Sequence, residues 1–169
     1  MKKATIIAAV LLGAAAGLLW RGHAAGSHDG PTHAPAVTVT AMDGTRIDLQ
    51  SLRGRPVLVN FWAPSCRECV REIPDLKALQ REYGPKGFTV VAIAMPYDPP
   101  TNVERIMRDL QFNFPVALDL TRQAAAAFGG VEAIPTSFLI APDGRIARRI
   151  VAGIEAGKLR DQIAAWVGS

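Results

Sequence analysis

Cys66 and Cys69, separated by two residues, are the only cysteines in this chain of 169 residues. They follow an apolar run, Val57 to Phe61, and precede a stretch with helical spacing. A helix N-terminus offers unpaired N–H groups and the positive end of the helix dipole, and both favour a thiolate. A second thiol one turn further along can close a disulfide or release a mixed disulfide. The spacing therefore indicates thiol–disulfide exchange.

A metal site is the alternative use of a Cys-x-x-Cys pair. A structural zinc ion needs two more ligands, and the chain has three histidines, His23, His28 and His33, all upstream of the expected domain. We therefore predict no metal ligand and no cofactor at the cysteine pair. Weak copper binding by the histidines together with the thiols, as in a metallochaperone, stays open as an alternative from a different class.

The first residues are typical of an export signal. Lys2 and Lys3 precede an apolar stretch over residues 4–20, and small residues allow cleavage after Ala24. The stretch is also close to the roughly 20 residues that span a bilayer, so residues 1–24 are predicted to be a signal peptide or an N-terminal membrane anchor. Either outcome places the remainder in the periplasm or an equivalent extracytoplasmic space, tethered to the inner membrane if the leader is retained.

The charge of the chain excludes a nucleic-acid partner. The sequence pI is 9.4, but three of the 19 basic residues lie in the leader, which leaves 16 against 15 acidic side chains. A nearly neutral remainder has no electrostatic footprint for nucleic acid. Residues 25–36 are small, polar and proline-containing, which predicts a flexible tether. Residues 37–169 are enough for one domain.

Strand and helix patterns alternate along this domain. Hairpins are predicted at both ends, one around Asp43-Gly44 and one around Pro142-Asp143-Gly144. Strands are predicted at 37–40, 46–49, 57–62, 88–94, 114–118, 137–140 and 145–150, and helices at 66–83, 101–111 with Thr101 as N-cap, 122–128 and 155–167. The order predicts an α/β fold with a mixed central sheet and helices on both faces.

The chain resembles the thioredoxin-fold proteins, and specifically the TlpA/ResA-like thiol–disulfide reductases. The matching residues are Val59-Asn60-Phe61-Trp62-Ala63, then Cys66-x-x-Cys69-x-x-Glu72-x-Pro74, then Ile134-Pro135-Thr136 before Phe138-Leu139-Ile140, and Asp143-Gly144. They cover most of the chain after the tether, in the family's order. The resemblance implies a thioredoxin fold with an N-terminal β-hairpin and a central αβ insertion between Pro96 and Asp119.

The resemblance also assigns roles to the cysteines and to a proline. It implies that Cys66 is the exposed attacking thiol and Cys69 the resolving one. An Ile–Pro bond is usually trans, whereas the resemblance implies that Pro135 is a cis-proline facing the disulfide. In the family, the backbone beside this proline pairs with the extended chain of the substrate. Ile134, Pro135 and Trp62 are therefore expected to bind substrate.

Glu72 lies one turn beyond Cys69 on nearly the same helical face. Its neighbours three and four positions away include no basic residue, so it has no ordinary helical ion pair. A partly desolvated carboxyl there would have a raised pKa and could exchange protons with the resolving thiol. Plain thioredoxins have a buried aspartate where this chain has Asn60, and the TlpA/ResA-like proteins share a glutamate at the Glu72 position. Glu72 is therefore predicted to be catalytic.

The likeness implies a protein-disulfide reductase whose clients are oxidised cysteine pairs in apocytochrome c or copper-site proteins. A membrane thiol-transfer protein would supply the electrons. Arg67 and Glu68 stand between the cysteines, where the family tends to have proline before the second cysteine, and this leaves the reduction potential open. A disulfide-forming oxidant is the alternative with the same residues. A peroxiredoxin fits less well because Ala63 occupies the position of that chemistry's threonine.

Overall fold

The computed structural model describes residues 30–168, and the predicted leader lies outside this range. The strands are β1 (Thr38–Thr40), β2 (Arg46–Asp48), β3 (Val57–Trp62), β4 (Thr89–Ala94), β5 (Val116–Leu118), β6 (Thr136–Ile140) and β7 (Ile146–Val151). The helices are α2 (Arg67–Tyr83), α3 (Pro100–Asp109), α4 (Gln123–Ala127) and α5 (Ala156–Val167), with short 3-10 turns at Leu49–Leu52 and Gly84–Lys86.

The main sheet is mixed, as predicted. Among the described residues its strand order is β5-β4-β3-β6-β7, with β3, β4 and β5 parallel and β6 antiparallel to both β3 and β7. β1 and β2 form the predicted N-terminal hairpin. The predicted central insertion is present as α3 and β5. This topology brings the carboxyl ends of β3, β4 and β5 and the start of β6 to one edge of the sheet.

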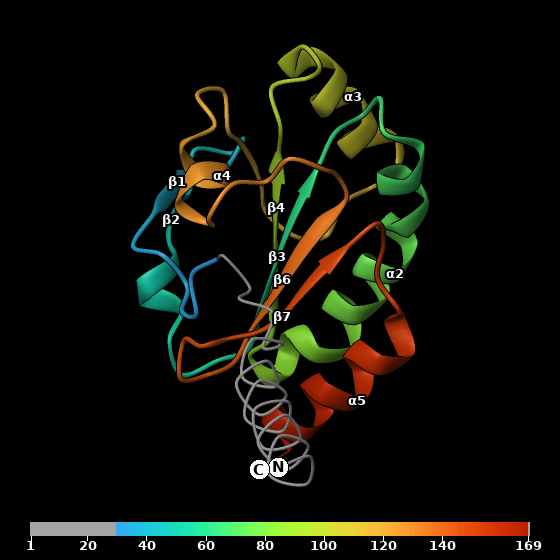
Figure 1. The fold of residues 1–169 in the computed structure, drawn as a ribbon. Coiled ribbons are helices and arrows are strands. Elements are labelled where there is room, and N and C mark those ends of the chain that lie inside the picture. The colour runs from blue at the N-terminus through green and yellow to red at the C-terminus, as the bar shows by residue number, and fades with distance from the viewer. Residues whose placement is uncertain (1–29, 169) are drawn as a thin grey trace, which may run out of the picture.

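Helices cover both faces of the sheet (Figure 1). Side chains alternate along a strand, so Leu58 and Trp62 of β3 pack with α2 and α5, whereas Val59 and Phe61 pack with α4 and the β1–β2 hairpin. The even-numbered residues of β3 therefore face α2. This alternation matters for the site because it also directs Asn60 toward α2.

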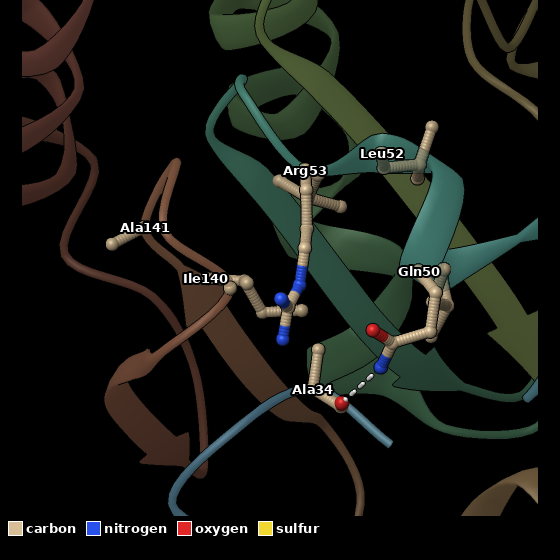
Figure 2. A pocket seen from close by; sticks show the side chains of 9 residues that line it. Ala34, Gln50, Leu52, Arg53, Ile140 and Ala141 are labelled. Carbon is tan, nitrogen blue, oxygen red and sulfur yellow. Dashed lines mark hydrogen bonds between the residues drawn. The ribbon is translucent and has the colours of Figure 1, made fainter. Parts of the chain in front are cut away.

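The packed domain begins before Val37, the predicted boundary. Thr32 O accepts a hydrogen bond from Ile146 N (2.8 Å), and Ala34 N donates to Gly144 O (2.8 Å). Figure 2 shows Gln50 donating to Ala34 O (2.8 Å) beside a small pocket at the end of β6. The tether prediction is therefore wrong for residues 32–34, because their backbone groups pair with the turn between β6 and β7. Its first part, residues 25–29, lies outside the described range.

The helix of the insertion begins earlier than predicted. α3 starts at Pro100 with Pro99 as its N-cap, so Thr101 is not the cap. Proline suits the first position of a helix because its fixed φ is already helical and its missing N–H would be unpaired there. Within residues 30–168, no helix is both long and apolar enough to cross a bilayer.

Candidate active site

The cysteine pair lies where β3 passes into α2. Cys66 is the N-cap of α2, and its Sγ accepts a hydrogen bond from Cys69 N (3.2 Å). A sulfur at an N-cap receives a helix N–H and the positive end of the helix dipole, both of which stabilise a thiolate. This position confirms that the predicted helix begins at the cysteines.

The two cysteines form a disulfide with Cα atoms 5.3 Å apart. Cys66 is half-buried, whereas Cys69 has no exposed surface. A sulfur can be attacked, or can attack, only where a partner reaches it. The unequal burial is what the expected division of labour requires, with Cys66 meeting the client and Cys69 acting from inside.

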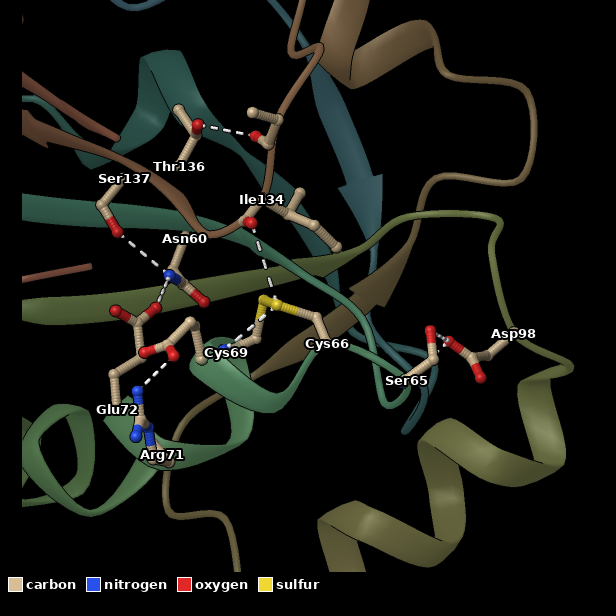
Figure 3. The surroundings of a disulfide bond; sticks show 12 residues. Asn60, Ser65, Cys66, Cys69, Arg71, Glu72, Asp98, Ile134, Thr136 and Ser137 are labelled. Atoms are coloured by element: carbon tan, nitrogen blue, oxygen red, sulfur yellow. Dashed lines mark hydrogen bonds and ion pairs between the residues drawn. A yellow bond between two sulfur atoms is a disulfide. The ribbon is translucent and has the colours of Figure 1, made fainter. Parts of the chain in front are cut away.

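The loop before β6 lies against the outer sulfur. The Ile134–Pro135 peptide bond is cis, as the resemblance implied. Ile134 O lies 3.8 Å from Cys66 Sγ, and Figure 3 shows the two atoms facing each other. Ile134 is half-buried and Pro135 is buried, and Pro135 O accepts a hydrogen bond from Ala152 N (2.9 Å).

Glu72 lies in the interior behind Cys69. Its side chain is 6% exposed. Oε1 accepts a hydrogen bond from Asn60 Nδ2 (2.7 Å), and Oε2 accepts one from Ile154 N (3.2 Å). Burial raises the pKa of Glu72 above its ordinary 4.5, and these two hydrogen bonds offset part of the rise because they favour the carboxylate.

Strand register explains why Asn60 meets Glu72. Asn60 of β3 pairs directly with Ser137 of β6, and both side chains face α2. Asn60 Nδ2 donates to Ser137 Oγ (3.0 Å) as well as to Glu72. The sequence aligned Asn60 with the buried aspartate of plain thioredoxins but gave no signal for Ser137 or Ile154, which are distant in the chain.

A carboxylate from the insertion holds the loop before Cys66. Asp98 Oδ2 accepts hydrogen bonds from Ser65 N (3.1 Å) and Ser65 Oγ (2.7 Å), as Figure 3 shows. Asp98 follows β4, and Ser65 follows β3, so adjacent parallel strands bring them together. Sequence reasoning missed this contact, although a short loop after the neighbouring parallel strand is where it could have been sought.

Comparison with known proteins identifies the chain. A family model described as "AhpC/TSA family" matches residues 31–149. The chain belongs to the AhpC/TSA family. It is 33% identical to the thiol-disulfide oxidoreductase ResA of Bacillus thuringiensis over 118 residues, which are 70% of this chain and 67% of the relative. It is 30% identical to ResA of Bacillus subtilis over 128 residues, covering 76% and 70% of the two chains.

Solved structures agree with these sequence relatives. A thiol:disulfide interchange protein of the thioredoxin family from Chlorobium tepidum superposes with a TM-score of 0.70 at 32% identity, covering 82% of this chain and 97% of that chain. The predicted thioredoxin fold and the TlpA/ResA-like resemblance are thereby confirmed. This AhpC/TSA-family chain is a thiol–disulfide oxidoreductase, and its Cys66 and Cys69 form a disulfide.

Trp62, which the sequence analysis expected to bind substrate, lies in the core of this AhpC/TSA-family chain. Its side chain has no exposed surface and packs against Phe112, with ring centroids 5.3 Å apart. Trp62 therefore supports the site from within the core and offers no surface atom to a client. It faces inward because it is an even-numbered residue of β3, on the side covered by α2.

The residues between the cysteines are both exposed in this AhpC/TSA chain. Glu68 pairs with Arg71 one turn further along α2, and this hydrogen bond lowers the pKa of Glu68.

Within residues 30–168, no group of three or more His, Cys, Asp or Glu side chains is arranged to hold a metal ion. His23 and His28, which the copper alternative also needs, lie outside this range.

Proposed function

We propose that this chain reduces disulfides in exported client proteins. In the reduced protein the Cys66 thiolate attacks one sulfur of a client disulfide, and the other client sulfur leaves as a thiolate that takes a proton. Cys69 then gives up its proton and attacks Cys66 Sγ, which releases the second client thiol. The client gains two electrons and two protons, and the Cys66–Cys69 disulfide re-forms.

The observation that carries the direction is the placement of the cysteine pair between two carboxylates. In Figure 3, Glu72 lies on one side of the disulfide and Asp98 on the other. Negative charge disfavours a thiolate, and a less stable thiolate makes the dithiol the better electron donor. The N-terminus of α2 and Arg67 both act in the opposite sense. Arg67 is exposed, so water and salt screen its charge.

Glu72 is proposed to carry the proton of the resolving step. Its burial places a carboxyl of raised pKa behind the buried thiol, in a region that bulk water does not reach. Such a group can accept the Cys69 proton when the mixed disulfide is resolved and return it when the dithiol is regenerated. This role is the one that the TlpA/ResA-like resemblance implied.

The backbone of Ile134 is proposed to hold the client. Pro135 O already accepts a hydrogen bond from Ala152 N, and Ile134 O faces Cys66 Sγ at 3.8 Å. An extended client segment beside Ile134 would therefore bring its disulfide next to the outer sulfur. Pro135 is buried, so this contact needs only the backbone of the segment.

The setting of the reaction follows from the leader. Residues 1–24 are proposed to export the domain and, if retained, to anchor it to the inner membrane. The expected clients are oxidised cysteine pairs of apocytochrome c or of copper-site proteins, and a membrane thiol-transfer protein would return the electrons. The relatives named ResA support the exchange chemistry, and the clients and the donor are part of the proposal.

The test is the reduction potential of the Cys66–Cys69 pair at equilibrium with a glutathione or dithiothreitol buffer. A value of about −270 mV, the range of thioredoxin, supports the reductase, whereas one of about −120 mV, the range of a strong oxidant, contradicts it. Retention of copper by the full chain after mild chelation, lost when both cysteines are changed to serine, would favour the metallochaperone instead.

A further inference from the structure

Two buried side-chain atoms among residues 30–168 have no hydrogen-bond partner, Trp62 Nε1 in the core and Asn60 Oδ1 beside Glu72 in the site. Asn60 has no exposed surface. Both hydrogens of its side-chain amide are used, one toward Glu72 Oε1 and one toward Ser137 Oγ. Its carbonyl oxygen, Oδ1, is buried without any hydrogen-bond donor. A buried acceptor that stays unpaired is costly because it has given up its hydrogen bond to water, so its presence at the centre of the site calls for a function.

The amide cannot relieve this cost by turning over. Rotation by half a turn would place Oδ1 against the Glu72 carboxylate, where two acceptors would face each other. It would also leave the amide nitrogen without Glu72 and Ser137 as acceptors. The two hydrogen bonds, at 2.7 and 3.0 Å, therefore fix the direction of Oδ1.

That direction is toward the cysteines. Figure 3 shows Oδ1 of Asn60 turned away from Ser137 and toward Cys69. Cys69 is fully buried, and in the disulfide its sulfur carries no hydrogen. Reduction by a donor dithiol adds two electrons and two protons to the Cys66–Cys69 bond, while the donor becomes a disulfide. One of these protons converts Cys69 Sγ into an S–H donor.

We propose that Asn60 is a positioning residue whose Oδ1 accepts a hydrogen bond from the Cys69 thiol in the reduced protein. The orphaned acceptor of the oxidised state is then satisfied on reduction. The inference rests on the exchange activity of the pair and deepens the proposed function, because it assigns a residue to the proton of the resolving thiol.

The same amide then acts on two proton sites in opposite senses. Its N–H favours the ionised form of Glu72, and its carbonyl favours the protonated form of Cys69. Asn60 therefore keeps the proton on Cys69 and off Glu72 in the resting dithiol, which leaves Cys66 as the thiolate that attacks the client. An aspartate at this position could not donate to Glu72 when ionised.

Other groups around this pair act on the same equilibrium. α2 contributes Glu68 and Asp75, whose charges raise the pKa of Glu72. The loop after β7 contributes Ile154 N–H, which favours the Glu72 carboxylate. β6 contributes the uncharged Ser137, and Cys66 itself is the remaining titratable neighbour. A test must therefore report on the Cys69 thiol itself, because a substitution of Asn60 also removes the hydrogen bonds from Nδ2 to Glu72 and Ser137.

The experiment uses the full-length C66S protein, in which Cys69 is the only thiol. Infrared spectroscopy should place the Cys69 S–H stretching band at the lowered frequency of a hydrogen-bonded thiol. Asn60→Leu, which replaces the amide by an apolar group of similar shape, should return the band to the frequency of an unbonded thiol. Asn60→Asp keeps an acceptor and should keep the band lowered. Ser137→Ala is the matched control, since it removes a partner of Nδ2 and leaves Oδ1 in place.

A titration gives a second readout in the same proteins. Because one hydrogen bond to the neutral thiol is lost, the Cys69 thiolate fraction at a fixed pH below its pKa should rise roughly two- to tenfold in Asn60→Leu. An unbonded S–H frequency in the parent C66S protein would overturn the proposal, even if Asn60→Leu failed to fold. So would a band or pKa that Asn60→Leu leaves unchanged. Neither measurement needs a client, so a failure here is separate from a failure of the reductase proposal.

Discussion

At the scale of single residues, Glu72 is a carboxyl that is buried although its charged form is more stable in water. A buried carboxyl is costly unless it serves the reaction, because its charged form loses the solvation of water. We expect Glu72→Gln to slow exchange with a disulfide substrate at least about tenfold, since general acid–base groups commonly contribute more than this. The pH profile of the rate should also lose the step that is due to titration of the Glu72 carboxyl. Stopped-flow kinetics over a pH series would measure both.

The exposed Glu104→Gln variant on α3 is a matched control for that experiment, because it removes the same charge from an exposed position on another helix. Its rate and pH profile should equal those of the parent protein. Identical profiles for Glu72→Gln and the parent would contradict the proton-transfer role of Glu72.

The raised pKa of Glu72 also predicts a pH dependence of stability. The unfolded chain releases this proton near the ordinary pKa of 4.5, and the folded protein releases it only at a higher pH. Over that window the folded state binds more protons, so its free energy of unfolding falls as the pH rises. Urea titrations should show that the parent loses stability relative to Glu72→Gln from about pH 4.5 upward. A difference that is constant with pH would contradict the burial effect.

Asp98 is the residue whose contribution sequence reasoning missed. Its carboxylate accepts two hydrogen bonds from Ser65 and lies next to the cap of α2. Asp98→Asn removes a negative charge from this loop, so the pKa of the Cys66 thiol should fall by roughly one unit or less. The pH dependence of alkylation by iodoacetamide measures it. The exposed Asp161→Asn on α5 is the control, and a rise in the Cys66 pKa would show that loop order matters more than charge.

At the scale of secondary structure, the N-terminus of α2 combines a structural cap with the reacting sulfur. Serine is a good N-cap residue and alanine a poor one. In the absence of the disulfide, Cys66→Ser should therefore be more stable than Cys66→Ala by about 1 kcal/mol. Both variants lack the disulfide and keep Cys69, so urea unfolding compares the cap alone. Equal stabilities would mean that the Cys69 N–H bond to the cap contributes nothing.

The elements were largely predictable because their signals are local. Continuous apolar runs marked β3 and β4, and Pro142-Asp143-Gly144 marked the turn between β6 and β7. The start of α3 could not be predicted, because threonine is usually a better N-cap than proline. Only the observed backbone shows that Pro99 is the N-cap of α3. Residues 32–34 were also missed, since their order comes from pairing with a turn more than a hundred residues away.

At the scale of the whole molecule, the site is assembled by the sheet from distant parts of the chain. Cys66, Cys69 and Glu72 belong to one helix, so their spacing alone predicted that they would be close. Ser137 of β6, the partner of Asn60, is 77 residues from it in the chain. Ile154 of the loop after β7, a partner of Glu72, is 82 residues from it. Only the strand register brings these partners into contact, and no local pattern reports it.

The direction of electron flow can be read from the stability of the whole domain. The reduction potential of the folded pair and the stabilities of the oxidised and reduced proteins are linked by one thermodynamic cycle, and a strong oxidant is one whose reduced form is the more stable. Carboxylates on both sides of Cys66–Cys69 disfavour thiolate in the reduced form. The oxidised protein should therefore unfold at a higher urea concentration than the reduced protein. A Cys66→Ser/Cys69→Ser variant, insensitive to the redox buffer, controls for effects of the reductant, and a more stable reduced form would contradict the reductase.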